Sequence, residues 1–199
     1  MDSQNNISKF DFKNIPGILS VVQPMWTDPS MRPEYARLYA ELILRCNIFE
    51  NDFRFQMEDE RGFCSAAFGT TKGEKNTARS WLDGVIKSGE FSDNDIYWFN
   101  NCVEYIEAND ARLQSHMTET DIQLSLFVSR IKGCGKVVLN EFLRHAKDCG
   151  YKRLFLWTDV ECDWEYYPAH GFELVEESVY DLYSRPGEPY KVFFYRKDL

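Results

Sequence analysis

Apolar side chains recur at helical spacing in three stretches of the chain. In residues 31–47 they fall on one face, which predicts an amphipathic helix. Residues 74–117 also follow a helical pattern, and Ser92 followed three positions later by Asp95 resembles a capping box. A third amphipathic stretch, residues 136–149, stops where a glycine follows it. The pattern therefore predicts three helical regions.

Shorter apolar or alternating runs predict strands between and after these helices. The runs cover residues 53–58, 62–70, 121–128, 153–157, 172–183 and 190–197, and a short helix is expected over residues 163–170. Proline and glycine in residues 24–33 and 184–189 indicate loops, the second of them a turn between the last two strands. The order of these elements predicts a mixed α/β fold.

The composition is that of a folded protein. Hydrophobic residues make up 44% of the 199 positions and aromatic residues 16%, which is enough for a packed core in one domain. No apolar run approaches the ~20 residues that a membrane-spanning helix needs. Residues 1–12 lack the basic start and the apolar core of a secretion signal, so a cytosolic location is expected.

Charge and cysteine spacing argue against several classes of partner. The chain has 32 acidic and 23 basic side chains, a net charge of −9, whereas nucleic acids and anionic membranes attract basic surfaces. The six cysteines show no CxxC spacing and no nearby histidine pair, so no metal site is expected.

Residues 130–153 are an exception to the acidic balance, because seven basic and two acidic side chains give them a local charge of +5. That charge suits a phosphate-bearing ligand.

The segment most informative about chemistry runs from an apolar strand through a glycine loop into a helix. The loop reads Arg130-x-x-Gly133-x-Gly135, and Lys132 and Lys136 add positive charge to it. Glycines allow a tight turn, and the backbone N–H groups of such a loop suit a pyrophosphate at the helix N-terminus. The alternative is an ordinary strand–helix turn, since both the Walker ending Gly-Lys-Ser/Thr and the full Gly-x-Gly-x-x-Gly are missing.

This loop resembles the central motif of the GNAT superfamily of acyl-CoA N-acyltransferases, Gln/Arg-x-x-Gly-x-Gly/Ala. Residues 167–172, Tyr-Pro-Ala-His-Gly-Phe, are similar to the family's Tyr-x-x-x-Gly-Phe, and the clear match covers about residues 120–182. The resemblance implies a mixed, mainly antiparallel central sheet flanked by helices. In such a fold residues 74–117 would be a helical insertion before the cofactor-binding strand, within a single domain of residues 1–199.

The resemblance also implies a reaction, in which an amine attacks the thioester of acetyl-CoA within a ternary complex. Acetyl-CoA would be the co-substrate, and no metal is implied. The strand end Leu126, Phe127 and Val128 would bond the pantetheine arm, and one N–H there would stabilise the oxyanion. The pyrophosphate would be held by Arg130, Ile131, Lys132, Gly133, Cys134, Gly135 and Lys136. Tyr167 stands where the family places its general acid, and its neighbour Tyr166 does not fit the motif spacing.

The base that takes the proton of the ammonium is marked less clearly. Family members often place a carboxylate at the start of the strand before the glycine loop, where this chain has Glu119 and Asp121. We take Asp121 as the candidate, and a plain surface acid is the alternative reading.

Two functions from different classes remain open. The first is an N-acetyltransferase acting on a primary amine of a small molecule or peptide. The negative net charge of the chain slightly favours a cationic acceptor. The second is a non-catalytic acyl-CoA-binding module whose helical insertion recruits a partner. Acylation at an RNA surface is disfavoured by the net charge of −9. No nucleic acid or membrane partner is expected, and the acceptor, the acyl chain and a homodimer are left open.

Overall fold

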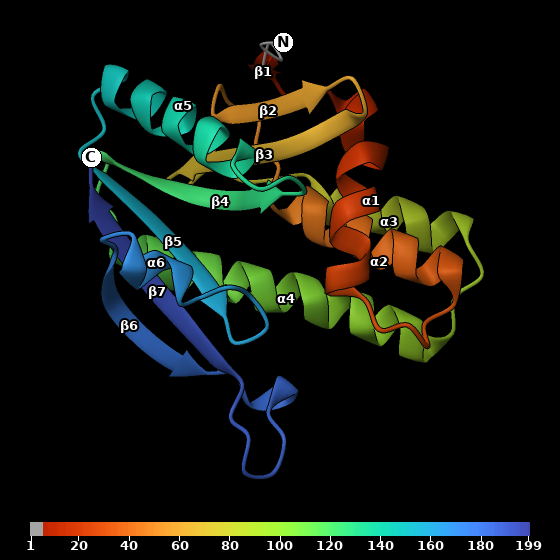
Figure 1. Ribbon diagram of the computed structural model, residues 1–199. Helices are drawn as coiled ribbons and strands as arrows, with labels where there is room; N and C mark the ends of the chain where they lie inside the picture. Colours follow the sequence, from red (N-terminus) through yellow and green to blue (C-terminus); the bar gives the residue numbers. More distant parts are fainter. Residues whose placement is uncertain (1–5) are drawn as a thin grey trace.

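One sheet of seven strands organises residues 6–199, the part of the chain that the computed structural model describes. The strands are β1 (Asn6–Lys9), β2 (Arg54–Asp59), β3 (Gly62–Thr71), β4 (Asp121–Ser129), β5 (Arg153–Asp159), β6 (Glu173–Val179) and β7 (Lys191–Asp198). Their order across the sheet is β1-β2-β3-β4-β5-β7-β6. Neighbouring strands are antiparallel except β4 and β5, which run parallel. One parallel pair therefore joins two antiparallel parts (Figure 1).

Helices cover both faces of this sheet (Figure 1). They are α1 (Ile15–Trp26), α2 (Pro33–Cys46), α3 (Ala78–Ser88), α4 (Asp93–Ser115), α5 (Cys134–Asp148) and α6 (Tyr166–Ala169). Helix α5 packs on β2, β3 and β4 through the fully buried Phe142. On the other face α1 and α2 cover β3 and β4, and α4 extends this layer to β5 and β7. None of the helices in residues 6–199 combines the length and the apolar character needed to cross a bilayer.

Local sequence explains where these helices begin and end. Ser92 Oγ accepts a hydrogen bond from the Asp95 N–H (3.2 Å), and the Asp95 carboxylate accepts one from the Ser92 N–H (3.0 Å), which completes the predicted capping box of α4. After α5, Gly150 has a φ of +88°, a left-handed conformation that ends the helix. The three predicted helical regions are confirmed, residues 74–117 as the pair α3 and α4.

Some predicted boundaries were wrong. The loop expected over residues 24–33 starts only at Thr27, because α1 continues through Pro24. That proline lies in the last turn, where the Thr27 N–H and Oγ1 both donate to the Gln23 carbonyl (3.1 and 2.8 Å) and hold the helix end. Strand β6 is shorter than the expected run 172–183, since a 3-10 helix, η2 (Asp181–Tyr183), follows it. β1 and α1 had no counterpart among the predicted elements.

Strand β4 carries one residue more than the strand it pairs with. Phe68 of β3 is paired with Leu126, and the next residue, Gly69, is paired with Leu124. Ser125 is therefore a bulge, which shifts the alternation of side chains by one position. Leu124 packs on the α5 side of the sheet, whereas Leu126 packs with α1 on the opposite side. Because of the bulge, the side chains of β4 after Ser125 lie on the opposite face of the sheet from the one that regular alternation would give them.

Candidate active site

Strands β4 and β5 separate soon after they begin. They pair at three positions, of which the last joins Gln123 to Phe155. Beyond it β4 continues to Ser129 and β5 to Asp159, each bonded to an antiparallel neighbour on its outer side. The two strands run apart toward their carboxyl ends (Figure 1). We call the space between these two ends the divergence, and its facing strand edges are free to bond an extended ligand through backbone groups.

The glycine loop leads from β4 directly into α5. Gly133 is the N-cap residue and has a φ of +94°, a conformation that glycine adopts without strain. Gly135 lies in the first turn of α5, where an added Cβ would stand 3.1 Å from Phe127 Cζ and 3.1 Å from Ser129 Cβ. The two glycines therefore have separate structural reasons, a left-handed turn at one and close packing of α5 on β4 at the other.

This loop presents polar hydrogens and positive charge. Within residues 6–199 the backbone N–H groups of Ile131, Lys132, Gly133, Gly135 and Lys136 donate no hydrogen bond, whereas that of Cys134 bonds to the Ile131 carbonyl (3.1 Å). The Lys132 and Lys136 side chains are exposed, and Arg130, also exposed, makes a long contact of 3.9 Å with Asp59. Free N–H groups at a helix N-terminus, with basic side chains around them, are favourable surroundings for phosphate oxygens.

Helix α6 carries the two adjacent tyrosines on the α5 side of the sheet. The Tyr167 ring packs 5.7 Å from that of Tyr195 on β7 and 5.4 Å from that of Phe172. Burial raises the pKa of Tyr167, so its hydroxyl keeps its proton at neutral pH. Tyr166 instead reaches toward β4, with its ring centroid 6.3 Å from that of Phe127. Tyr167 thus packs against β7, and Tyr166 approaches β4, one of the two strands of the divergence.

Asp121 lies at the closed end of the divergence, where β4 begins. The carboxylate accepts hydrogen bonds from Arg153 Nε and Nη2 (2.8 and 2.6 Å) and from Thr118 N–H and Oγ1 (2.6 and 2.8 Å). Burial acts to raise the pKa of Asp121, but the hydrogen bonds from Arg153 and Thr118 hold it below its usual value. With both oxygens occupied, the geometry favours a structural ion pair over the base that the sequence predicts. Glu119 is exposed just before the strand.

A carboxylate that the sequence analysis did not single out lies where the strands separate. Asp110 of α4 accepts hydrogen bonds on Oδ1 from Gln123 Nε2 of β4 (2.6 Å) and from Trp157 Nε1 of β5 (2.7 Å). Burial raises the pKa of Asp110 to about 6, although both hydrogen bonds act to lower it. The sequence contained one sign that Asp110 faces inward, because Asp110 continues the apolar stripe of Val103 and Ile106 at helical spacing.

Comparison with known proteins adds the fold family. No family model matches the sequence, and neither does any curated protein. Solved structures match over nearly the whole chain. The C-terminal condensation domain of Ebony, in complex with beta-alanyl-dopamine, has a TM-score of 0.62 at 9% identity and covers 99% of this chain and 100% of its own.

Two named N-acetyltransferases match in the same way. A mosquito arylalkylamine N-acetyltransferase like 5b has a TM-score of 0.56 at 12% identity, covering 98% of this chain and 99% of its own. The ribosomal-protein-S18-alanine N-acetyltransferase from Escherichia coli has a TM-score of 0.53 at 10% identity, covering 98% and 94%. This chain has the GNAT fold. The predicted mixed, mainly antiparallel sheet flanked by helices is confirmed, while at such identities the chemistry must be argued from the residues of this chain.

A hollow on the α2–α4 side of the GNAT sheet gathers aromatic side chains from distant segments. It has a volume of about 620 Å³, and we call it the aromatic pocket. Tyr35 and Tyr39 come from α2, Trp98 from α4 and Tyr183 from η2. Its other lining residues are Asp28, Met31, Arg32, Asn94, Asp95 and Arg185. The pocket therefore joins aromatic faces with charges of both signs.

Tyr105, which lies behind the pocket lining, connects the aromatic pocket to the carboxyl end of β5. The ring of Tyr183 lies 5.1 Å from that of Tyr105, between centroids, and the Tyr105 hydroxyl donates to Asp159 Oδ2 (2.9 Å). Tyr105 also packs edge-on against Trp157, at 5.5 Å. Continuous side-chain contacts thus lead from the pocket to the open side of the divergence.

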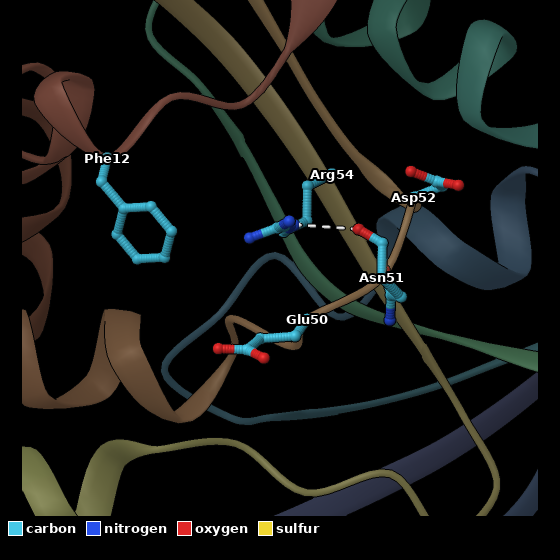
Figure 2. A pocket seen from close by; sticks show the side chains of 5 residues that line it. All are labelled: Phe12, Glu50, Asn51, Asp52 and Arg54. Carbon is cyan, nitrogen blue, oxygen red and sulfur yellow. Dashed lines mark hydrogen bonds between the residues drawn. The ribbon is translucent and has the colours of Figure 1, made fainter.

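A second hollow, of about 420 Å³, lies beside the start of β2 (Figure 2). Phe12 and Arg54 face each other across it, with Arg54 Cζ 5.9 Å from the ring centroid, and Arg54 Nε donates to the Asn51 carbonyl (3.0 Å). Glu50 and Asp52 complete its lining. Since β3 stands between β2 and β4, this hollow is separated from the divergence, and we give it no part in the site.

Proposed function

We propose that the protein is an acetyl-CoA-dependent N-acetyltransferase that modifies a primary amine. The observation that carries the proposal is the arrangement of groups at the start of α5, which we propose as the anion site. In the described chain it combines N–H groups without partners, three exposed basic side chains and a free strand edge that leads to them. N-acetyltransferases among the solved structures of the same fold support this reading.

In this proposal coenzyme A lies along β4. Its pantetheine arm has amide groups that can bond the free edge formed by Leu126, Phe127 and Val128. The pyrophosphate then meets the loop of residues 130–136, where the free N–H groups and basic side chains neutralise it. An N–H of the strand edge bonds the thioester oxygen as it becomes an oxyanion, which contributes several kcal/mol of transition-state stabilisation.

The chemical step is a direct transfer. The amine nitrogen attacks the carbonyl carbon of the thioester, an N–C bond forms, and the C–S bond breaks. Tyr167 gives its hydroxyl proton to the departing thiolate, the nitrogen releases one proton to solvent as it becomes an amide, and the tyrosinate takes a proton back from solvent. The Tyr167 hydroxyl is protonated at neutral pH, as this role requires, because its ordinary pKa of about 10 is raised further by burial.

The aromatic pocket is the proposed entrance for the acceptor. Its rings can stack on an aromatic substrate, and their faces can also contact a cationic group. Two proteins of the same fold are named for such molecules, the mosquito arylalkylamine N-acetyltransferase like 5b and the Ebony domain in complex with beta-alanyl-dopamine. We therefore propose an amine carried on an aromatic group as the acceptor class.

Binding of acetyl-CoA tests the anion site. Acetyl-CoA at about a hundred times its Kd should raise the free energy of unfolding by roughly 2.7 kcal/mol, seen as a higher Tm. The double variant Lys132→Glu, Lys136→Glu should lose most of this shift, because the reversed charges repel the pyrophosphate. Lys152→Glu, an exposed charge reversal just after α5, is the matched control and should keep it.

Release of free thiol from acetyl-CoA in the presence of a panel of amines, including tyramine and butylamine, tests turnover. No Tm shift at millimolar acetyl-CoA would contradict the proposed function. A shift without thiol release on any amine would instead favour a non-catalytic acyl-CoA-binding module.

A further inference from the structure

Asp110 stands at the point where the two central strands part. Its Oδ1 accepts one hydrogen bond from Gln123, which belongs to the last pair between β4 and β5, and one from Trp157, two positions beyond that pair on β5. A single carboxylate oxygen therefore bridges both strands at the start of the divergence. Oδ2 of Asp110 accepts no hydrogen bond from residues 6–199, and the side chain is half-buried, so this oxygen is free for another donor.

No cationic side chain of residues 6–199 forms an ion pair with the Asp110 carboxylate. Its recorded partners are neutral groups, an amide and an indole. Glu107, one turn earlier on α4, adds negative charge, and that residue is itself paired with Arg79 of α3. From α2 the side chain facing it is the thiol of Cys46, which burial keeps neutral by raising its pKa. Asp121, by contrast, is neutralised by Arg153.

A second unsatisfied group lies at the same place. Gln123 is 1% exposed, and its Oε1 is buried and accepts no hydrogen bond from the part of the chain that the structure describes. A buried amide oxygen without a donor destabilises the fold, because its hydration is lost and no hydrogen bond replaces it. An N–H or ammonium group brought to this point by a ligand would satisfy it. The start of the divergence thus offers two oxygens, on Gln123 and Asp110, to a positively charged nitrogen.

We infer that Asp110 is the catalytic base, which takes a proton from the acceptor's ammonium group directly or through one water. This inference rests on the proposed function and names a residue that the loop and tyrosine motifs do not contain. The carboxylate and the ammonium become a carboxylic acid and a neutral amine. The amine then attacks the thioester as described above, and Asp110 returns its proton to solvent after the product leaves. A carboxylate that titrates near neutrality can both accept and release this proton.

The first measurement is made on the wild-type protein without substrate. Carbon-13 NMR of the aspartate side-chain carboxyls, with Asp110→Asn used to assign the resonance, should show Asp110 titrating near pH 6. Titration of Asp110 at or below the ordinary aspartate value of about 3.9 would overturn the inference.

The second measurement is thiol release with tyramine as the amine between pH 5 and 9. Asp110→Asn keeps an acceptor for the Trp157 N–H, so we expect unchanged acetyl-CoA affinity. Turnover should fall by roughly 10²-fold or more, and the acid limb of the kcat/KM profile near pH 6 should disappear. Asp110→Glu should recover part of the rate. Glu104→Gln, an exposed change on the same helix, is the matched control and should behave as wild type.

The outcomes separate this inference from the proposed function. Wild-type turnover together with an Asp110→Asn variant that keeps its rate and its acid limb would overturn the role of Asp110 alone. A wild-type protein that releases no thiol with any amine would overturn both.

Discussion

Tyr166 and Tyr167 are adjacent in sequence but differ in their surroundings. Tyr167 packs against Tyr195 and Phe172 on one side of the divergence, and its hydroxyl makes no hydrogen bond to residues 6–199. The Tyr166 ring stacks on the His170 ring, with 3.8 Å between centroids, and its other neighbour is the ring of Phe127 on β4. A phenol with a free hydroxyl beside the leaving thiolate can donate its proton, so the identity of the general acid depends on which ring faces the sulfur.

Replacing each hydroxyl separately distinguishes the two tyrosines. Tyr167→Phe keeps the packed ring, so Tm and acetyl-CoA affinity should change little. Its turnover should fall by roughly 10²-fold or more if the hydroxyl protonates the thiolate, measured as thiol release under saturating acetyl-CoA. Tyr166→Phe is the control and should leave turnover nearly unchanged. The reverse pair of results would make Tyr166 the acid, whereas two silent variants would mean that the thiolate leaves without a protein acid.

At the scale of elements, the ion pair between Asp121 and Arg153 joins the first residues of β4 and β5. The two residues face each other in the parallel register, and the Asp121 side chain is fully buried. The pair closes one end of the two strands, while the other end remains apart. It therefore holds the paired end of the two strands together, which gives Asp121 a structural role.

This assignment predicts how stability depends on pH. Because the pKa of Asp121 is lowered in the folded chain, the pair's contribution is fully present above the unfolded value of about 3.9. It is lost as the pH falls through the lower folded value. Asp121→Asn should lower the unfolding free energy by about 1–3 kcal/mol at pH 7, because it removes the charge that binds the partly exposed Arg153. The difference in unfolding free energy between wild type and variant should shrink below pH ~4.

Urea denaturation at pH 7 and pH 3 measures this difference. Glu173→Gln is the comparison, since its exposed carboxylate pairs with Arg196 (2.9 Å) and such surface pairs contribute at most about 1 kcal/mol. A difference for Asp121→Asn that is equally large at both pH values would contradict the assignment. Turnover that survives in this variant would separately support a structural role.

The elements that could be predicted from sequence are those whose signals are local. Helical spacing, the Ser92 capping box and the glycine motif are each contained within a few residues, and all gave the correct element. The loop start expected at residue 24 was wrong because Pro24 is tolerated in the last turn of α1. The buried pairing of Asp121 was missed because its partner, Arg153, lies 32 residues away. Partners across the sheet become visible only when the strand register is known.

At the scale of the whole molecule, the aromatic pocket depends on segments that are far apart in sequence. The loop after α1, the first turns of α4 and η2 meet there, and Arg32 Nη2 bonds Asp95 Oδ2 (2.6 Å) between two of them. Helix α4 contributes Trp98 near its start and Asp110 toward its end. One helix placed before β4 thus supplies both a wall of the proposed acceptor entrance and the proposed base.

Trp98 provides the test of the acceptor class. Its indole packs against the ring of Tyr183, 6.5 Å away between centroids with the planes 28° apart, so the two rings together present an aromatic face on which a flat substrate can stack. Removing one aromatic contact costs about 1 kcal/mol. Trp98→Ala should therefore raise the KM for tyramine about fivefold and leave the Kd for acetyl-CoA unchanged, measured by thiol release and by calorimetry.

Butylamine is the matched substrate, because it carries a primary amine without a ring. Its KM should respond less than that of tyramine to Trp98→Ala, and Trp98→Phe should restore most of the binding of tyramine by returning an aromatic face. If the KM values of both amines rise equally, the pocket recognises only the amine, and the aromatic acceptor class is wrong. If neither KM changes, the acceptor reaches the divergence by another route, and the aromatic pocket has no part in binding it.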